Sequence, residues 1–539
     1  MKLAPLTVYV LTDTHYFSKK IGTSGKAYDF DNAKSQKLLA DSVEVLSTAF
    51  DQLAEDKEND IVLISGDVTN NGELESHEEF IEMLRDLKKR GKRVFVLTAT
   101  HDFRQEGKTH AYRGDERIEI PAATRDMLFD MYREFGPDQA IAVHRQSMSY
   151  IVQLCDGYRL FALNDDTNLN NKSGFSDECF EWISERAKEA RKDNQFIIAM
   201  THHPLIAPSP IYEIIGKGNM LGDYDKRIEQ LADLGIQFIF TGHTHIQDVS
   251  AYQSEKGNVI YDICTGSTIG YPAPIRKASF VPDENKVFLS TDFVRTPESF
   301  KEEGKDLHSV LEEQLIGVVR NLVKTADEDI DKLADMVEAI SIKPKIIYKF
   351  GWIIKPIFKL INSLKIGTVA KWVKKETGLK PSYYKDIKDK KVVDLIIELA
   401  INLFSGESKY TPDTPTYKIT LGFLSILDSV LRILHIDLKK ITKVVSSLVE
   451  LVEPLLCNSK IDSYNAEIPI YGFVEAGKSS VVCKETLRKF DLKVKKSKKG
   501  LPIIVITVLL LIALLPLILI ILAGGYICNL IRYRDKINT

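Results

Sequence analysis

Short clusters of aspartate and histidine recur in the first half of the sequence, at spacings that suit a metal centre. They are Asp13-Thr14-His15, Gly66-Asp67, Thr100-His101-Asp102, His202-His203-Pro204 and Gly242-His243-Thr244-His245. Six of the eleven histidines of the 539-residue chain lie in these segments. One-residue spacing lets alternate side chains point into one site. Carboxylate with imidazole suits Mn, Fe, Zn or Co, whereas Mg favours oxygen donors alone.

Such a donor set is suited to two cations held close together. A shared carboxylate such as Asp67 can bridge two metal ions about 3.5–4 Å apart. The ions would lower the pKa of a bound water and so provide a metal-bound hydroxide at neutral pH. They would also hold the oxygens of a tetrahedral phosphate for in-line attack. We therefore predict two divalent metal ions as cofactors and a phosphate ester as substrate.

Each cluster follows a run of residues typical of a β-strand. Strands are predicted over 7–11, 61–65, 94–98, 159–163, 196–200, 238–241 and 258–264, with helices over 31–54 and 73–89. This alternation predicts an α/β fold, a layered β-sheet with flanking helices. In open α/β sheets ligands bind where strands end, and Gly66, Gly242 and Gly266 would supply tight turns there. We expect the clusters to meet at one sheet edge.

The order DxH, GD, HD, HHP and GHxH resembles that of the calcineurin-like metallophosphoesterase family. The resemblance covers roughly residues 7–295 and implies a metallophosphoesterase domain over 1–298. It further implies an enzyme, a metal-dependent phosphoric ester hydrolase with phosphodiesterase or phosphatase activity. A membrane-bound, non-catalytic adaptor or scaffold on the same fold is the alternative.

Carried over position by position, the resemblance implies a role for each motif. The ligands would be Asp13, His15 and His245 for the first metal, His202 and His243 for the second, and Asp67 as the bridge. His101 would approach the scissile phosphate, stabilising charge or protonating the leaving oxygen, and Asp102 would orient its imidazole. His203 would either support a ligand or contact the substrate.

One position departs from the family pattern. The family has Gly-Asn-His-Asp, with asparagine as a ligand of the second metal, whereas this chain reads Ala99-Thr100-His101-Asp102. A threonine hydroxyl is shorter than an amide and a poorer neutral donor. Either Thr100 is a metal ligand, directly or through water, or the second metal binds more weakly.

An uncharged run near the C-terminus predicts a membrane anchor. The 22 residues of 501–522 carry no charge and are long enough to span the hydrocarbon core, so we predict a single transmembrane helix over 501–523 and a short basic tail over 524–539. The run is preceded by Lys493, Lys495, Lys496, Lys498 and Lys499 and followed by Arg532, Arg534 and Lys536. The larger cluster favours a cytoplasmic catalytic domain, and no signal peptide is visible.

Between the domain and the anchor the pattern becomes helical, which predicts a helical, basic, membrane-proximal module over 299–492. Helices are expected over 306–340 and 417–456. Residues 343–380 contain ten lysines and one acid, with apolar residues at helical spacing and two tryptophans. A basic amphipathic helix of this kind is typical of a segment on an anionic membrane surface. The alternative is a helix whose apolar stripe packs against protein.

Other features of the sequence exclude several classes of function. A net charge of −3 argues against a general nucleic-acid binder, and the six cysteines lack the spacing of a zinc knuckle or disulfide framework. Gly472–Ser479 matches the P-loop pattern, but too few residues follow to carry the magnesium-binding acid, so no nucleotide is predicted there. The oxygen-rich run 164–168 would contact substrate or form a turn. The expected partners are a phosphate-ester substrate, with a lipid-linked phosphate as the hypothesis, and membrane lipids.

Overall fold

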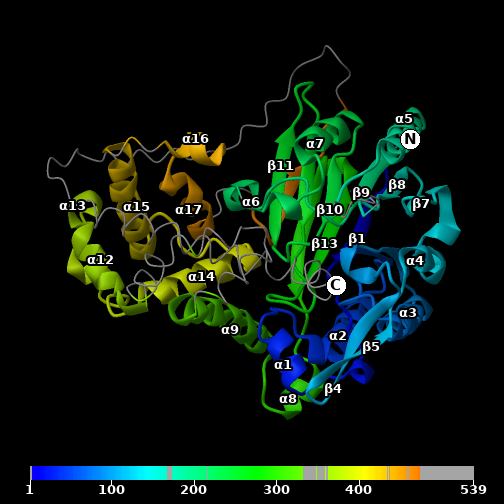
Figure 1. The fold of residues 1–539 in the computed structure, drawn as a ribbon. Coiled ribbons are helices and arrows are strands. Elements are labelled where there is room, and N and C mark those ends of the chain that lie inside the picture. The colour runs from blue at the N-terminus through cyan, green and yellow to red at the C-terminus, as the bar shows by residue number, and fades with distance from the viewer. Residues whose placement is uncertain are drawn as a thin grey trace. The chain divides into compact units, whose positions relative to one another are not determined.

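The computed structural model describes residues 3–166, 173–214, 216–329, 362–433, 437–457 and 461–473, with the single residues 331, 348, 359 and 435. The chain forms two compact units (Figure 1). The first comprises the described parts of 1–208, 218–315 and 461–484, and the second those of 209–217, 316–460 and 485–539.

A mixed sheet carries the first three site motifs. Among the described residues its order is β15-β14-β13-β1-β2-β3. The strands are β1 (Leu6–Leu11), β2 (Ile61–Ser65), β3 (Arg93–Leu97), β13 (Pro274–Val281), β14 (Lys286–Phe293) and β15 (Ala466–Pro469). β1, β2 and β3 are parallel, whereas β13, β14 and β15 add in antiparallel fashion. Every residue of β2 is buried, as expected for a central strand that is covered on both faces.

A second sheet carries the last two motifs and has the order β11-β12-β10-β9-β8-β7-β6 among the described residues. Its strands are β6 (Ala140–His144), β7 (Ser149–Cys155), β8 (Tyr158–Ala162), β9 (Phe196–Met200), β10 (Phe238–Thr241), β11 (Asp248–Gln253) and β12 (Val259–Cys264). β8, β9, β10 and β12 are parallel, and the other pairs are antiparallel.

The two sheets pack face to face around one apolar core. This core draws on both sheets, with Val8, Leu63 and Phe95 from the first and Leu160, Ile198 and Phe240 from the second. On the outer face of the second sheet, α5 (Asp177–Lys192) and α7 (Tyr224–Asp233) contribute residues to a separate apolar cluster. α2 (Ser42–Glu55) and α3 (Leu74–Lys89) pack together beside β3. The predicted α/β layered domain is confirmed.

The structure interrupts the helix that the sequence predicts over 31–54. α1 (Lys26–Asn32) ends early, and a short turn over Leu39–Asp41 precedes α2. Residues 31–37 are all polar except Ala33, so the apolar periodicity that drives helix packing begins only at Leu38. The intervening loop buries two polar side chains, Gln36 and Lys37.

Smaller elements complete the first unit. They are the hairpin of β4 (Lys108–Arg113) and β5 (Glu116–Pro121), α4 (Arg125–Met131), α8 (Glu298–Glu302) and the start of α9 (Leu307–Glu328). Arg113 donates to the carbonyl oxygens of Lys20 and Ile21, and Arg117 forms a forked pair with Asp31 at 2.8 Å. These arginines fasten the hairpin to the region around α1.

The described part of the second unit is mainly helical, which confirms the predicted helical C-terminal part. Its helices are α6 (Pro210–Ile214), the rest of α9, α12 (Ile366–Trp372), α13 (Lys374–Thr377), α14 (Val392–Ser405), α15 (Pro415–Ile433), α16 (Leu438–Thr442) and α17 (Leu448–Leu456). α15 packs against α12, α13 and α17. The helix predicted over 417–456 is therefore three helices, and β15, beyond the expected boundary at 298, still belongs to the sheet.

Among the helices of the described residues, none has the length and apolarity needed to cross a membrane. The predicted transmembrane segment over 501–523, the lysine cluster before it and the tail over 524–539 lie outside the described residues. So do most of the P-loop-like match and the part of the basic segment before residue 362.

Candidate metal centre

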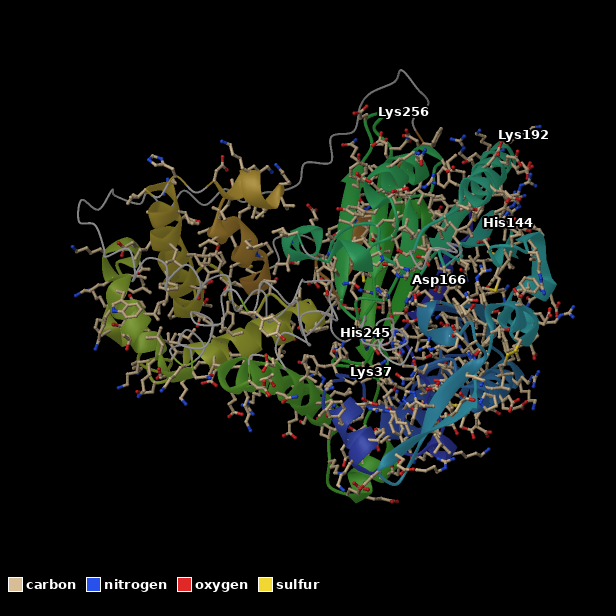
Figure 2. All side chains as sticks on the ribbon, in the orientation of Figure 1. Lys37, His144, Asp166, Lys192, His245 and Lys256 are labelled. Atoms are coloured by element: carbon tan, nitrogen blue, oxygen red, sulfur yellow. The ribbon has the colours of Figure 1, made fainter. Side chains whose placement is uncertain are left out.

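The predicted site residues meet where strands of the two sheets end. Asp13, Asp67, His202 and His243 each lie two residues past the end of a strand, β1, β2, β9 and β10 respectively. Backbone bonds join the loops, because Asp13 N donates to Gly66 O at 3.0 Å. His243 N donates to Asp13 Oδ2 at 2.9 Å, which links the second sheet to the first. Figure 2 shows His245 among these strand ends.

Backbone conformation at the site is unusual. Five predicted ligands have φ between 36° and 64°, in the left-handed region: Asp13, His15, Asp67, His243 and His245. Each such residue costs about 1–3 kcal/mol, a strain that proteins retain at functional sites. Gly66 and Gly242 lack a side chain, which allows the loops of the site to approach each other closely. A Cβ on Gly66 would lie 2.5 Å from His202 Nδ1, and one on Gly242 would lie 2.1 Å from Thr12 Oγ1.

The first cluster consists of Asp13, His15 and His245. The Nε2 atoms of the two histidines lie 3.0 Å apart, and Asp13 Oδ1 lies 3.2 Å from His245 Nε2. Among the described residues, the buried Asp13 Oδ1 has no hydrogen-bond partner. His15 Nδ1 is 3.3 Å from Thr69 O, a contact in which the nitrogen donates, so Nε2 keeps its lone pair for the cluster. This arrangement fits a metal ion.

The second cluster consists of Asp67, His202 and His243. His202 Nε2 lies 3.0 Å from Asp67 Oδ2 and 3.2 Å from His243 Nδ1. His202 Nδ1 donates to Ser65 O at 2.9 Å. Burial opposes ionisation of Asp67, but the adjacent His202 and His101 imidazoles outweigh it and hold its pKa well below the usual range. Asp67 also lies within ligand distance of His15 and His101, as a bridging ligand must.

His101 lies beside Asp67 in the site, and its hydrogen-bond partner differs from the prediction. The imidazole Nδ1 donates to Asn70 O at 2.7 Å, and Nε2 lies 3.9 Å from Asp67 Oδ2. Asp102 instead accepts from Thr69 N at 2.8 Å and from Ala99 N at 2.7 Å. This corrects the expectation that Asp102 orients the ring. The backbone carbonyl oxygen of Asn70 orients the ring. The buried carboxyl group of Asp102 instead joins the backbone at Thr69 to the backbone at Ala99.

Thr100, which the sequence leaves open as a ligand, contacts a residue of the oxygen-rich run. Its hydroxyl donates to Asp166 Oδ1 at 3.1 Å. Asp165 Oδ2 accepts from His203 N at 2.8 Å and lies 3.1 Å from His203 Nδ1, so Asp165 fixes the orientation of His203. These contacts attach Asp165 and Asp166, two residues of the run, to the candidate site.

The comparisons with known proteins agree with this geometry. Residues 6–247 match the family described as calcineurin-like phosphoesterase. The match covers 242 of the 539 residues, so it describes this segment and not the whole chain. The match confirms the predicted resemblance to this family over residues 6–247 and supports a metal-dependent phosphoester hydrolase. Comparison with curated proteins finds no matching sequence.

Three solved structures illustrate what this chain is similar to in fold. A dimetal phosphatase from Danio rerio is 12% identical with a TM-score of 0.38, over 53% of this chain and 95% of that chain. A purple acid phosphatase from yellow lupin is 12% identical with a TM-score of 0.34, over 54% and 52%. A 5'-nucleotidase precursor from Thermus thermophilus is 11% identical with a TM-score of 0.30, over 59% and 59%. This chain therefore spans little more than half the length of the last two.

Sequence reasoning missed the residues that the loop between α1 and α2 brings to the candidate metal centre. Gln36 Nε2 lies 2.7 Å from His245 Nδ1, and Lys37 Nζ donates to Asn70 Oδ1 at 2.7 Å. Both side chains are at most 4% exposed. The available signal was the polar run 34–37, which interrupts the apolar pattern of the predicted helix. Figure 2 shows Lys37 and His245 close together in the view.

Proposed function

We propose that this protein hydrolyses a phosphate monoester or diester at a centre of two divalent metal ions. The ligands would be Asp13, His15, Asp67, His202, His243 and His245, with Thr100 as the candidate for a seventh. The convergence of the His15 and His245 Nε2 atoms on the unpartnered Asp13 Oδ1 carries the proposal. A buried carboxylate oxygen without a hydrogen-bond partner is costly unless a cation joins it.

The chain's own residues would position and protonate the substrate. When bound, the metal ions would activate water and neutralise phosphate charge. His101 Nδ1 donates to Asn70 O, which leaves the other ring nitrogen, Nε2, on the side of Asp67. Burial lowers the pKa of His101 to about 3. An arriving phosphate anion would favour the protonated imidazole, which could then give a proton to the leaving oxygen.

We further propose that the protein acts at a membrane, attached through residues 501–523 with its catalytic domain in the cytoplasm. The uncharged run and the larger lysine cluster before it support this proposal. A lipid-linked phosphate is the substrate that such a location favours. The alternative is a membrane-bound adaptor that keeps the fold without the reaction.

The decisive experiment compares turnover with metal content. The full chain, purified in detergent with Mn, Fe, Zn or Co, is assayed with p-nitrophenyl phosphate and its bis ester. D67N should lower kcat/KM about 1000-fold, because the loss of a bridging carboxylate removes several kcal/mol of transition-state stabilisation. H144Q is the matched control, since His144 on β6 is drawn well away from His245 (Figure 2). Absence of turnover together with absence of two metals by elemental analysis would favour the adaptor.

A further inference from the structure

The imidazole of His245 faces a side chain at Nδ1, whereas two other proposed ligands face backbone oxygens there. The Nδ1 atoms of His15 and His202 each lie beside a backbone oxygen, at 3.3 and 2.9 Å. His245 Nδ1 instead lies 2.7 Å from Nε2 of the Gln36 amide. Because this partner is a side chain, substitution can remove it and leave the ligand itself in place.

The atom of His245 that faces the first cluster is Nε2. It lies 3.2 Å from Asp13 Oδ1 and 3.0 Å from His15 Nε2. A neutral imidazole carries one N–H and one lone pair, so a lone pair on Nε2 requires the proton to be on Nδ1. The group beside Nδ1 must then accept a hydrogen bond. In the amide of Gln36 only the oxygen can do so.

The Gln36 amide can supply this acceptor without a change of shape. A half-turn about its last torsion exchanges Oε1 and Nε2, which have nearly the same size. With Nε2 beside the ring, Oε1 is buried and has no hydrogen-bond partner among the residues that the structure describes. A buried acceptor without a donor is unfavourable. The half-turn pairs this oxygen with the N–H of His245 Nδ1.

The loop that carries Gln36 is held on both sides of this residue. Before it, Gln314 Nε2 of α9 donates to two backbone oxygens of the loop, at 3.1 and 2.6 Å. After it, Leu38 N donates to Ile269 O at 2.9 Å. The Gln36 side chain is 0% exposed. A side chain that is buried and held in this way has already lost most of its freedom, so it can restrain the imidazole that it contacts.

We propose that Gln36 is a positioning residue, whose amide oxygen accepts the Nδ1 proton of His245 and so keeps Nε2 available to the first metal ion. The inference rests on the proposed function and adds to its first metal site a residue outside the ligand set. Hydrogen-bond partners of metal-bound histidines change metal affinity by about 10- to 100-fold. Since Gln36 contacts a member of the first cluster, its loss should weaken that ion selectively.

The test measures metal binding by the full chain, purified in detergent and stripped of metal. Calorimetric titration with Mn gives two binding constants, which H15Q and H243Q assign, because each removes a ligand of one cluster. Q36L and Q36M remove the acceptor and should weaken the first ion at least tenfold, with the second ion within about threefold. Q36E keeps an acceptor and should bind the first ion at least as tightly as the unaltered protein. Q139L, the same change at an exposed glutamine, is the control and should alter neither constant.

A purely structural role for Gln36 would give a different pattern. If the side chain only fills the loop, Q36L and Q36M would lower stability in urea and would weaken both ions equally or neither. Either result would overturn the inference, as would a first ion that Q36E weakens as much as Q36L does. If the unaltered chain shows the expected pattern but cleaves neither p-nitrophenyl phosphate nor its bis ester, the proposed function fails and the role of Gln36 stands. A chain that binds no metal would contradict both.

Discussion

At the scale of single residues, Thr100 separates this chain from the family pattern. Its hydroxyl donates to Asp166, and it stands where the family has an asparagine ligand. T100N should tighten binding of the second metal about tenfold, because an amide oxygen reaches further and is a better donor than a hydroxyl. Calorimetric titration of the metal-free protein with Mn measures this directly. T100S is the control and should match the unaltered protein.

The same titration has a clear contrary result. An unchanged second binding constant in T100N would show that position 100 does not face the second metal. The contact of Thr100 with Asp166 would then be structural, and the six remaining donors would hold both ions.

The residues that meet at the candidate metal centre could be predicted from the sequence, but several of their hydrogen-bond partners could not. Asp13, His15 and His245 follow β-like runs in an order that resembles one family, and the structure brings them together. The partner of His101 was predicted as Asp102, whereas the observed acceptor is a backbone oxygen of Asn70. A backbone carbonyl has no sequence signature. For the same reason, chain conformation alone reveals that Lys37 is next to the site.

At the scale of elements, most strands that carry ligands were predictable and the strands that complete the first sheet were not. The predicted strand over 238–241 coincides with β10, because its apolar run is continuous. β13 carries Arg276, which is fully buried in the middle of the strand and breaks the expected alternation. β15 follows about 170 residues after β14, so only long-range pairing creates it. Local patterns contain no information about such pairing.

Arg276 holds the segment just before β15 against the strands of the first unit. It donates to Cys264 O at 2.9 Å and also to Ser463 O, shortly before β15. R276M should lower the free energy of unfolding by about 3 kcal/mol, since it leaves buried carbonyl oxygens without a donor. Urea unfolding measures the loss. R145M is the control because Arg145 is 55% exposed. An equal effect of the two variants would show that Arg276 does not hold the segment.

A buried histidine in α3 makes stability depend on pH. His77 Nε2 donates to Asp102 O at 2.8 Å, and Tyr132 donates to its Nδ1 at 2.8 Å. Burial lowers the pKa of His77 to about 4, whereas an unfolded histidine titrates near 6.5. The unfolded chain therefore takes up the proton first, and stability falls as the pH drops from about 6.5 to about 4.

H77Q tests this dependence, because glutamine can keep the bond to Asp102 O without titrating. Between pH 7 and pH 5 the unaltered protein should lose about 2 kcal/mol more than H77Q, as judged by urea unfolding with a chelator present. Comparing the two proteins cancels the contributions of the other histidines. Parallel losses in both would mean that His77 does not carry the effect.

At the scale of the whole molecule, the candidate metal centre and the uncharged run 501–522 are encoded in separate parts of the chain. The centre depends on residues 13–245, and the run begins 28 residues after the last described residue, Phe473. Neither feature requires the other, so the two proposals can fail independently. An active enzyme that is released from membranes would keep the chemistry and lose the lipid-linked substrate.

Attachment to the membrane is tested by extraction of the expressed full chain. Membranes washed with high salt and alkaline carbonate should retain it, because a helix of 22 uncharged residues would satisfy its own backbone hydrogen bonds within the hydrocarbon. The double variant L510R/L514R should be released, since each arginine near the centre of a span costs about 3 kcal/mol. Changing the five lysines at 493–499 to glutamine is the control and should leave the protein in the pellet. If carbonate releases the unaltered chain, the run does not span the bilayer. Attachment would then have to come from basic residues such as the lysines at 493–499, and high salt alone would disrupt it.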